Sequence, residues 1–250
     1  MVPMIVKEVH AKTILSRSKV FDYAVNPYVG CEHGCTYCYA RFMKRFTGHR
    51  ERWGEFVDVK INATSLLRLE AKKKRAGRVW ISGTCDPYQP LESEYELTRG
   101  CLEVLSGHGW PVTVQTKSPL VRRDIELLRK FSDVEVGLTI TTADESIRKI
   151  FEPCLPSIKE RIEALEKLRS AGVKTFAMIA PLLPGAEGLA AQLTEKVDYV
   201  LVDRMNYHYA DWVYKKNRLE YAMTDGFFSR KKIEFASALK RENIPHQLLF

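Results

Sequence analysis

Several features that would assign this 250-residue chain to a membrane or secreted class are missing from its sequence. No stretch approaches the roughly 20 apolar residues that a membrane-spanning helix needs, which argues against a helical membrane protein. The apolar run at the N-terminus is short and is interrupted by Lys7 and Glu8, so it lacks the form of a signal peptide. No proline- or serine-rich linker divides the chain. We therefore expect one domain over residues 1–250, in the cytoplasm, where thiols stay reduced.

Charge is abundant and is biased toward one sign. The net charge is +8, and basic runs occur at residues 72–75, 215–218 and 230–232. Each run alone is best explained as solvated helix surface, but together they keep a polyanionic partner, such as a nucleic acid, in consideration. The sequence leaves the oligomeric state open.

Short apolar runs alternate with amphipathic stretches along most of the chain. Continuous apolarity of this kind indicates strands buried on both faces, which are predicted at residues 21–27, 78–82, 111–116, 134–140, 174–180 and 198–202. Between them, Ser157 with Glu160 and Ser93 with Glu96 have the spacing of helix capping boxes. Strand, helix and strand in succession predict right-handed crossovers and a parallel α/β sheet.

The number of predicted strands limits the architecture. Six are too few for a closed eight-stranded barrel, so an open partial barrel or a doubly wound sheet is expected. Its core would cover residues of about 20–205. The aromatic-rich tail at about 206–250 is expected to be a short C-terminal extension that packs across the sheet.

Polar residues collect just after the predicted strands. A cysteine loop follows the first strand, "GTCDPYQP" the second, "KSP" the third and "TTAD" the fourth. Because the C-terminal ends of parallel strands lie at one rim of a sheet, these segments are expected to converge on one active site.

Cys31, Cys35 and Cys38 form a C-x3-C-x2-C motif in the first of these loops. Zinc would need a fourth ligand, which His33 or His49 could supply, and would indicate a zinc-stabilised nucleic-acid-binding module. A [4Fe–4S] cluster held by three thiolates instead leaves one iron open. An open iron suits S-adenosylmethionine, whose amine and carboxylate can chelate it before one-electron cleavage to a 5′-deoxyadenosyl radical. A simple electron-transfer iron–sulfur protein is the third alternative.

This motif, on a loop after the first strand, resembles the signature of the radical S-adenosylmethionine superfamily. "NPYVGCEHGCTYCYAR", "TCDPYQPLE" and "TKSPLVRRDIELL" are similar to the subgroup that includes spore photoproduct lyase. The resemblance covers residues of about 20–188 and implies a partial (β/α)6 TIM-like barrel with an open side. It also implies a [4Fe–4S] cluster, S-adenosylmethionine and an external one-electron reductant of ferredoxin or flavodoxin type. Whether the enzyme is a lyase or a transferase stays open.

The resemblance assigns individual residues as well. Cys31, Cys35 and Cys38 match the cluster ligands, and Lys117 matches a lysine that pairs with the methionyl carboxylate. Tyr39 abuts the cluster at a position near the adenine and is also a catalytic candidate. Other residues expected to line the cofactor are Tyr37, Ser82, Thr84, Asp86 and Thr139.

The chain departs from the lyase in ways that bear on its substrate. Where the lyase has a hydrogen-donating cysteine, this sequence has Gly83, and the nearest thiol is Cys85, our candidate for that role. The lyase's DNA-engaging hairpin is not evident in the shorter tail, so photoproduct repair is not expected. The aromatic run at residues 206–214 would suit base stacking, but a hydrophobic plug of the open barrel is the favoured interpretation. A nucleic acid or nucleotide is one candidate substrate.

Overall fold

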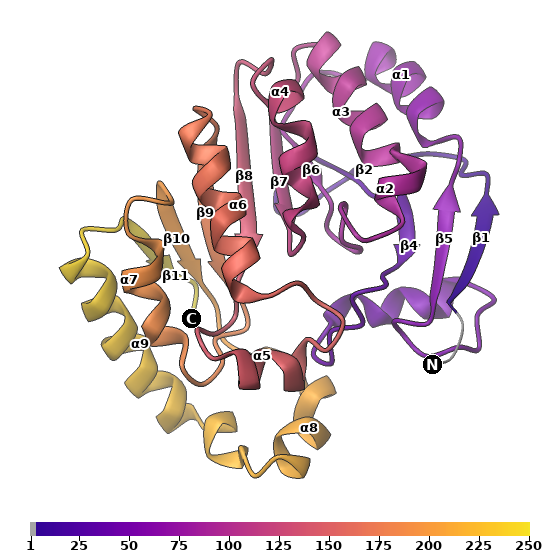
Figure 1. Ribbon diagram of the computed structural model, residues 1–250. Helices are drawn as coiled ribbons and strands as arrows, with labels where there is room; N and C mark the ends of the chain where they lie inside the picture. Colours follow the sequence, from indigo (N-terminus) through magenta and orange to yellow (C-terminus); the bar gives the residue numbers. More distant parts are fainter. Residues whose placement is uncertain (1–3) are drawn as a thin grey trace.

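The computed structural model describes residues 4–250 and is built around an eight-stranded sheet (Figure 1). The strand order is β11-β10-β9-β8-β7-β6-β3-β2, so the sheet is open rather than closed into a barrel. All neighbours from β3 to β11 pair in parallel, while β2 is antiparallel to β3. The strands are β2 (Leu15–Arg17), β3 (Tyr23–Val25), β6 (Val79–Ile81), β7 (Val112–Thr116), β8 (Val134–Thr139), β9 (Lys174–Ile179), β10 (Tyr199–Val202) and β11 (His246–Leu248).

The six predicted strands correspond to β3, β6, β7, β8, β9 and β10, and their existence and parallel order are confirmed. The prediction for the C-terminal tail is wrong in one respect. The tail does not simply lie across the sheet, because β11 extends the sheet by pairing with β10 in the register Val200↔His246. Backbone pairing at an open edge favours this position over packing on a face.

A second, three-stranded sheet was not predicted. It has the order β1 (Ile5–Val9), β5 (Phe56–Lys60) and β4 (Tyr28–Gly30). It positions the cysteine loop, because β4 ends at Gly30 immediately before Cys31. Gly30 has φ +92°, and a Cβ there would lie 2.2 Å from the carbonyl oxygen of Phe56, so only glycine fits.

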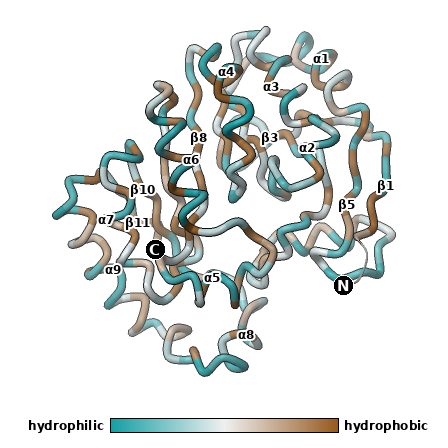
Figure 2. Tube along the Cα trace, in the orientation of Figure 1, coloured by the Kyte–Doolittle hydropathy of each residue, from teal (hydrophilic) through white to brown (hydrophobic). Residues whose placement is uncertain are grey.

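Helices follow the strands and form an arc outside the sheet, from α1 to α9 (Figure 1). Hydrophobic residues are concentrated along the strands, whereas the helices are more hydrophilic on their outer turns (Figure 2). Within residues 4–250, no helix has both the length and the apolar character needed to cross a membrane. The helices are η1 (Tyr39–Phe46), α1 (Ala63–Lys73), α2 (Glu92–Tyr95), α3 (Leu97–Gly107), η2 (Pro119–Asp124), α4 (Ile125–Leu128), α5 (Glu145–Phe151), α6 (Ile158–Ser170), η3 (Ala186–Gly188), α7 (Leu189–Leu193), η4 (His208–Ala210), α8 (Asp211–Lys216), η5 (Glu220–Met223) and α9 (Asp225–Arg241).

Of the two predicted capping boxes, one is confirmed and one is wrong. Ser157 accepts a hydrogen bond from the Glu160 amide and donates its own amide to the Glu160 carboxylate. Glu96 instead adopts a left-handed backbone conformation, with φ +49°, and separates α2 from α3. The buried Glu92 carboxylate takes its place by accepting the amides of Thr98 and Arg99 at the start of α3.

Removing the hydroxyl of Ser157 should therefore destabilise the protein, whereas removing that of Ser93 should not. Ser157→Ala is expected to lower the free energy of unfolding by about 1 kcal/mol, because the amide at the start of α6 loses its acceptor. Ser93→Ala, whose hydroxyl only donates to the carbonyl of Pro90, should stay within about 0.5 kcal/mol of the parent. Denaturant unfolding measures both, and equal losses would contradict the assignment.

Candidate active site

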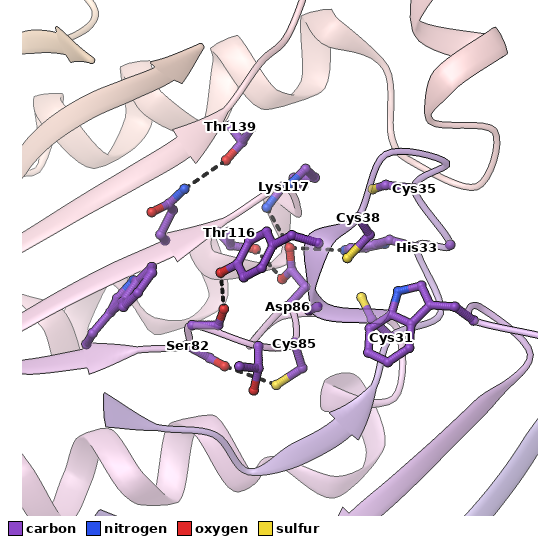
Figure 3. Close-up of a pocket in the computed structure, with 18 residues that line it drawn as sticks. Cys31, His33, Cys35, Cys38, Ser82, Cys85, Asp86, Thr116, Lys117 and Thr139 are labelled. Carbon is purple, nitrogen blue, oxygen red and sulfur yellow. Dashed lines mark hydrogen bonds and ion pairs between the residues drawn. The ribbon is translucent and has the colours of Figure 1, made fainter. Parts of the chain in front are cut away.

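The cysteine loop and the C-terminal ends of β6, β7 and β8 surround a cavity of about 100 Å³, called here the cysteine cavity (Figure 3). Its wall contains all but one of the residues predicted as cluster ligands, cofactor contacts or catalytic groups. These are Cys31, Cys35, Cys38, Tyr39, Ser82, Thr84, Cys85, Asp86, Lys117 and Thr139. The structure thus brings together residues that are up to 108 positions apart in the chain, while their individual roles stay predictions.

The three thiols come from one tight loop and are largely shielded from solvent. Cys31 and Cys35 are 7% and 6% exposed, and the Cys38 amide donates to the carbonyl of Cys35. Burial raises the pKa of the Cys35 thiol to about 12 and also raises that of Cys31. These thiols keep their protons at neutral pH, and binding to a metal would replace those protons.

The donor set fits a cluster better than a single ion. Within residues 4–250, no three His, Cys, Asp or Glu side chains converge as ligands of one metal ion. A structural zinc site is built on such a group. In a cubane cluster each thiolate binds a different iron, so the sulfurs can stay apart.

Asn26 holds the loop after β6, and the sequence analysis missed it. Its side-chain oxygen accepts hydrogen bonds from the Ser82 hydroxyl at 2.6 Å, the Gly83 amide at 3.0 Å, and both the amide and the hydroxyl of Thr84 at 2.8 and 2.9 Å. One acceptor thereby fixes three successive residues that face the cavity. The available signal was an asparagine followed by Pro27 at the end of a buried strand.

Asp86 connects three of the segments around the cavity. Its carboxylate accepts from the Thr116 hydroxyl at 2.5 Å and the Lys117 amide at 2.7 Å, and it lies 3.3 Å from His33 Nε2. Burial alone would raise its pKa, but His33 and the hydrogen bonds lower it to about 2. Because protein donors occupy most of its acceptor positions, the geometry gives Asp86 a positioning role. Contact with a cofactor stays a prediction.

Lys117 provides a partly buried positive charge beside the thiols (Figure 3). Among the residues that the structure describes, no carboxylate lies within ion-pair distance of its ammonium, which is 5.9 Å from the centre of the Tyr37 ring. Burial alone would lower its pKa, but the Cys35 sulfur in its thiolate form and the carboxylates of Glu152 and Asp86 together outweigh burial and raise it. The ammonium is therefore charged at neutral pH and suits an anionic ligand.

Tyr37 is the one predicted residue outside the cysteine cavity. Its ring lines a neighbouring cavity, and its hydroxyl donates to the buried carboxylate of Glu152. Glu152 also lies 2.7 Å from Arg161, and neither side chain of this ion pair is exposed. Tyr37 therefore anchors the cysteine loop to the interior, which is a structural role that the sequence analysis did not anticipate.

The neighbouring cavity, called here the adjoining cavity, has a volume of about 310 Å³ and shares Cys35, Cys38, Tyr39 and Lys117 with the first. Its outer wall comes from residues 203–207, after β10. Such a space next to the thiols is large enough for part of a substrate.

Aromatic residues of the C-terminal segment close this wall. The rings of Tyr39 and Tyr207 stack with their centres 5.9 Å apart, and Tyr207 stacks in turn on Tyr209. Tyr214, in contrast, is buried against Phe151. The run at 206–214 thus contains a partly exposed stack of rings and one buried ring.

Three further lining residues escaped prediction. Gln115 donates a hydrogen bond from its side-chain amide to the Thr139 hydroxyl at 3.3 Å. Gln115 therefore competes with the cofactor for this hydroxyl. Trp80 and Trp53 line the cysteine cavity, and each has a buried indole nitrogen without a hydrogen-bond partner among residues 4–250. Nothing in their local sequence distinguishes them from core aromatics.

Comparison with known proteins identifies the family of this chain. The model of the radical SAM superfamily matches residues 25–187. An uncharacterized protein of Methanocaldococcus jannaschii is 37% identical over 179 residues, which are 71% of this chain and 67% of that protein. An uncharacterized protein of Mycobacterium tuberculosis is 32% identical over 171 residues, 66% of this chain but only 50% of the relative's length.

Solved structures agree at the level of the fold. Spore photoproduct lyase in complex with dinucleoside spore photoproduct superposes with a TM-score of 0.67 at 16% identity, covering 98% of this chain and 82% of the lyase. SuiB of Streptococcus suis bound to S-adenosylmethionine gives a TM-score of 0.54 at 15% identity, covering all of this chain and 51% of SuiB. At these identities the similarity concerns the fold alone.

Proposed function

Because this chain belongs to the radical SAM superfamily of enzymes, we propose that Cys31, Cys35 and Cys38 hold a [4Fe–4S] cluster beside a site for S-adenosylmethionine. Enzymes of this superfamily use both cofactors. When bound, they supply one-electron cleavage of the sulfonium to methionine and a 5′-deoxyadenosyl radical, which abstracts hydrogen from a substrate. The observation that supports the proposal is that three thiols of one loop, two buried and one partly buried, line the same cavity as an ammonium that has no ion-pair partner among residues 4–250.

The other lining residues would bind and orient the cofactor. The Lys117 ammonium would pair with the methionyl carboxylate, and the hydroxyls of Ser82, Thr84 and Thr139 would offer hydrogen bonds. The Tyr39 ring, held by its hydroxyl's hydrogen bond to the Gly83 carbonyl, would form the wall against the adenine. Asn26 already holds residues 82–84 by hydrogen bonds. This segment would therefore lose little conformational entropy when the cofactor binds.

Cys85 remains our candidate for returning a hydrogen atom to a substrate radical, with Tyr39 as the second candidate. Its sulfur lies 3.0 Å from the Ser82 hydroxyl, and burial raises the pKa of the thiol to about 11. A thiol that keeps its proton at neutral pH still carries the S–H bond that hydrogen-atom donation requires. This chemistry favours hydrogen-atom donation as the role of Cys85 over nucleophilic attack by its thiolate.

For the substrate we propose a nucleic acid or nucleotide that enters the adjoining cavity. The stacked rings of Tyr39 and Tyr207 offer flat faces to a base. Arg204 in the same wall, now paired with the exposed carboxylate of Asp225, would exchange that partner for a phosphate. The net charge of +8 supports an anionic substrate. An external one-electron reductant completes the reaction.

We further interpret the chain as one domain, with a core at about 20–205 and an extension at about 206–250. The open sheet, with its parallel strands in chain order, supports a partial (β/α)6 barrel to which β11 adds one more strand.

Anaerobic reconstitution followed by reduction with dithionite tests the proposed function directly. We expect formation of 5′-deoxyadenosine from S-adenosylmethionine; an intact reduced cluster that forms none would refute the proposal. One zinc and no iron after anaerobic purification would favour the zinc module instead. An electron-transfer protein would show no change in the paramagnetic spectrum of its reduced cluster when S-adenosylmethionine is added.

Lys117→Ala is expected to weaken binding of S-adenosylmethionine without loss of iron. A hydrogen bond between charged groups contributes about 1.5–3 kcal/mol, so the dissociation constant should rise roughly 10- to 150-fold. Equilibrium dialysis with the reconstituted protein measures the change, and exposed Lys130→Ala serves as the control. Unaltered affinity in Lys117→Ala would reject the assigned role.

A further inference from the structure

Half of the net charge of the chain lies in a twelve-residue stretch that follows the cysteine loop. Residues 41–52 contain five basic residues and one glutamate, a net charge of +4 out of +8. Two of these basic side chains form hydrogen bonds within the protein: Arg41 donates to the carbonyl of Thr36, and Lys44 donates to that of Arg50. Arg45, Arg50 and Arg52 are exposed.

An exposed apolar side chain lies beside one of these charges. Phe46 is 70% exposed, and the guanidinium of Arg45 lies 5.0 Å from the centre of its ring. Exposed aromatics next to arginines are typical of protein–protein contact surfaces, where both residue types are enriched. We call Arg45, Phe46, Arg50 and Arg52 the basic face.

The inner side of the same segment adjoins the proposed cluster site. Trp53 lines the cysteine cavity together with all three thiols. Gly54 packs backbone to backbone on Gly34 of the cysteine loop, and a Cβ on Gly54 would lie 2.8 Å from the Gly34 Cα. A partner bound to the basic face would therefore be separated from the cysteine loop by this one segment.

We propose that the basic face is the docking site of an acidic one-electron donor protein, an inference that rests on the proposed function of the cysteine cavity. In the transfer, the donor is oxidised by one electron and the cluster is reduced by one; no bond forms or breaks and no proton moves. Complementary charge would accelerate the encounter between the two proteins and make it dependent on ionic strength.

A nucleic acid is the other polyanion that a basic surface attracts, but the geometry disfavours it here. A substrate has to reach the adjoining cavity, and the residues that the structure places around that cavity include none from 41–53. The basic face instead adjoins the thiols through Trp53, which is where an electron has to arrive.

The test compares two charge-reversal variants of equal size. Arg45→Glu/Arg50→Glu/Arg52→Glu reverses the basic face, and Lys72→Glu/Lys73→Glu/Arg75→Glu reverses three exposed charges at the end of α1. Formation of 5′-deoxyadenosine is measured with reduced flavodoxin and, separately, with dithionite. With flavodoxin, kcat/KM of the first variant should fall at least about tenfold and lose its dependence on salt. The control should stay within about twofold of the parent with both reductants.

Each outcome separates the docking proposal from the proposed function. Activity with dithionite and the iron content show whether a variant is intact; if the triple variant loses iron, the single variants Arg45→Gln and Arg50→Gln replace it, with about threefold effects expected. An unchanged rate with flavodoxin, or equal losses in both triple variants, would overturn the docking site. So would loss of binding to a single-stranded oligonucleotide at an unchanged flavodoxin rate. Absence of 5′-deoxyadenosine from the parent protein with dithionite would instead refute the proposed function.

Discussion

Cys35→Ala is expected to yield a protein without an iron–sulfur cluster and with no formation of 5′-deoxyadenosine above background. Cys35 is 6% exposed and lines both the cysteine cavity and the adjoining cavity. With only three thiolates in the loop, loss of one leaves two ligands for a cubane that normally has at least three. Iron and sulfide content and the visible absorption after anaerobic reconstitution measure the loss. Cys31→Ala and Cys38→Ala should behave in the same way.

The chain contains its own controls for this experiment. Cys101 is fully buried in α3 and Cys154 is exposed, and neither lines the cysteine cavity. Cys101→Ala and Cys154→Ala should therefore retain iron and absorption at the parent level. An unchanged cluster absorption in Cys35→Ala would contradict the assigned ligands, whereas losses in all variants would indicate general damage to the fold.

The parts of the fold that could be predicted are those in which one sequence signal dominates. The strands β7 and β8, for example, consist mostly of apolar and β-branched residues, because both of their faces are largely covered. The sheet β1-β5-β4 has no such signal. β1 is largely exposed, and β4 is only three residues long and is formed by its pairing with β5. Short strands of this kind depend on tertiary contacts that a local pattern does not contain.

The same distinction applies to the site. Cysteines at fixed spacing and polar residues at strand ends are visible in the sequence because their chemistry is uncommon there. Asn26 and Trp53 look ordinary, and they matter only because the fold brings Asn26 next to Thr84, 58 positions away, and Trp53 next to the thiols. The second predicted capping box failed for a related reason: the buried carboxylate of Glu92 satisfies the amides that Ser93 and Glu96 were expected to cap.

Arg161→Met should cause the largest loss of stability among the changes considered. Arg161 and Glu152 form a completely buried ion pair with a distance of 2.7 Å, and Arg161 also donates to the carbonyls of Pro156 and Thr139. Burial alone would raise the pKa of Glu152, but Arg161, together with Lys117 and the Tyr37 hydroxyl, outweighs burial and lowers it. Without the arginine, a carboxylate would be left in the interior without its counter-charge. Such a loss costs about 3–5 kcal/mol and should lower the melting temperature by roughly 6–20 °C.

A second substitution distinguishes the buried charge from a simple loss of packing. Glu152→Gln in the Arg161→Met background removes the unpaired charge and keeps an acceptor for the Tyr37 hydroxyl, so it should restore part of the lost stability. Arg169→Met is the control, because the Arg169–Asp198 pair is more than one-third exposed and should cost no more than about 1 kcal/mol. Thermal unfolding of the metal-free protein under reducing conditions compares the three variants. Since Tyr37 lies between Cys35 and Cys38, Arg161→Met should also retain less iron after reconstitution. If it unfolds like Arg169→Met, the buried pair is not what anchors the cysteine loop.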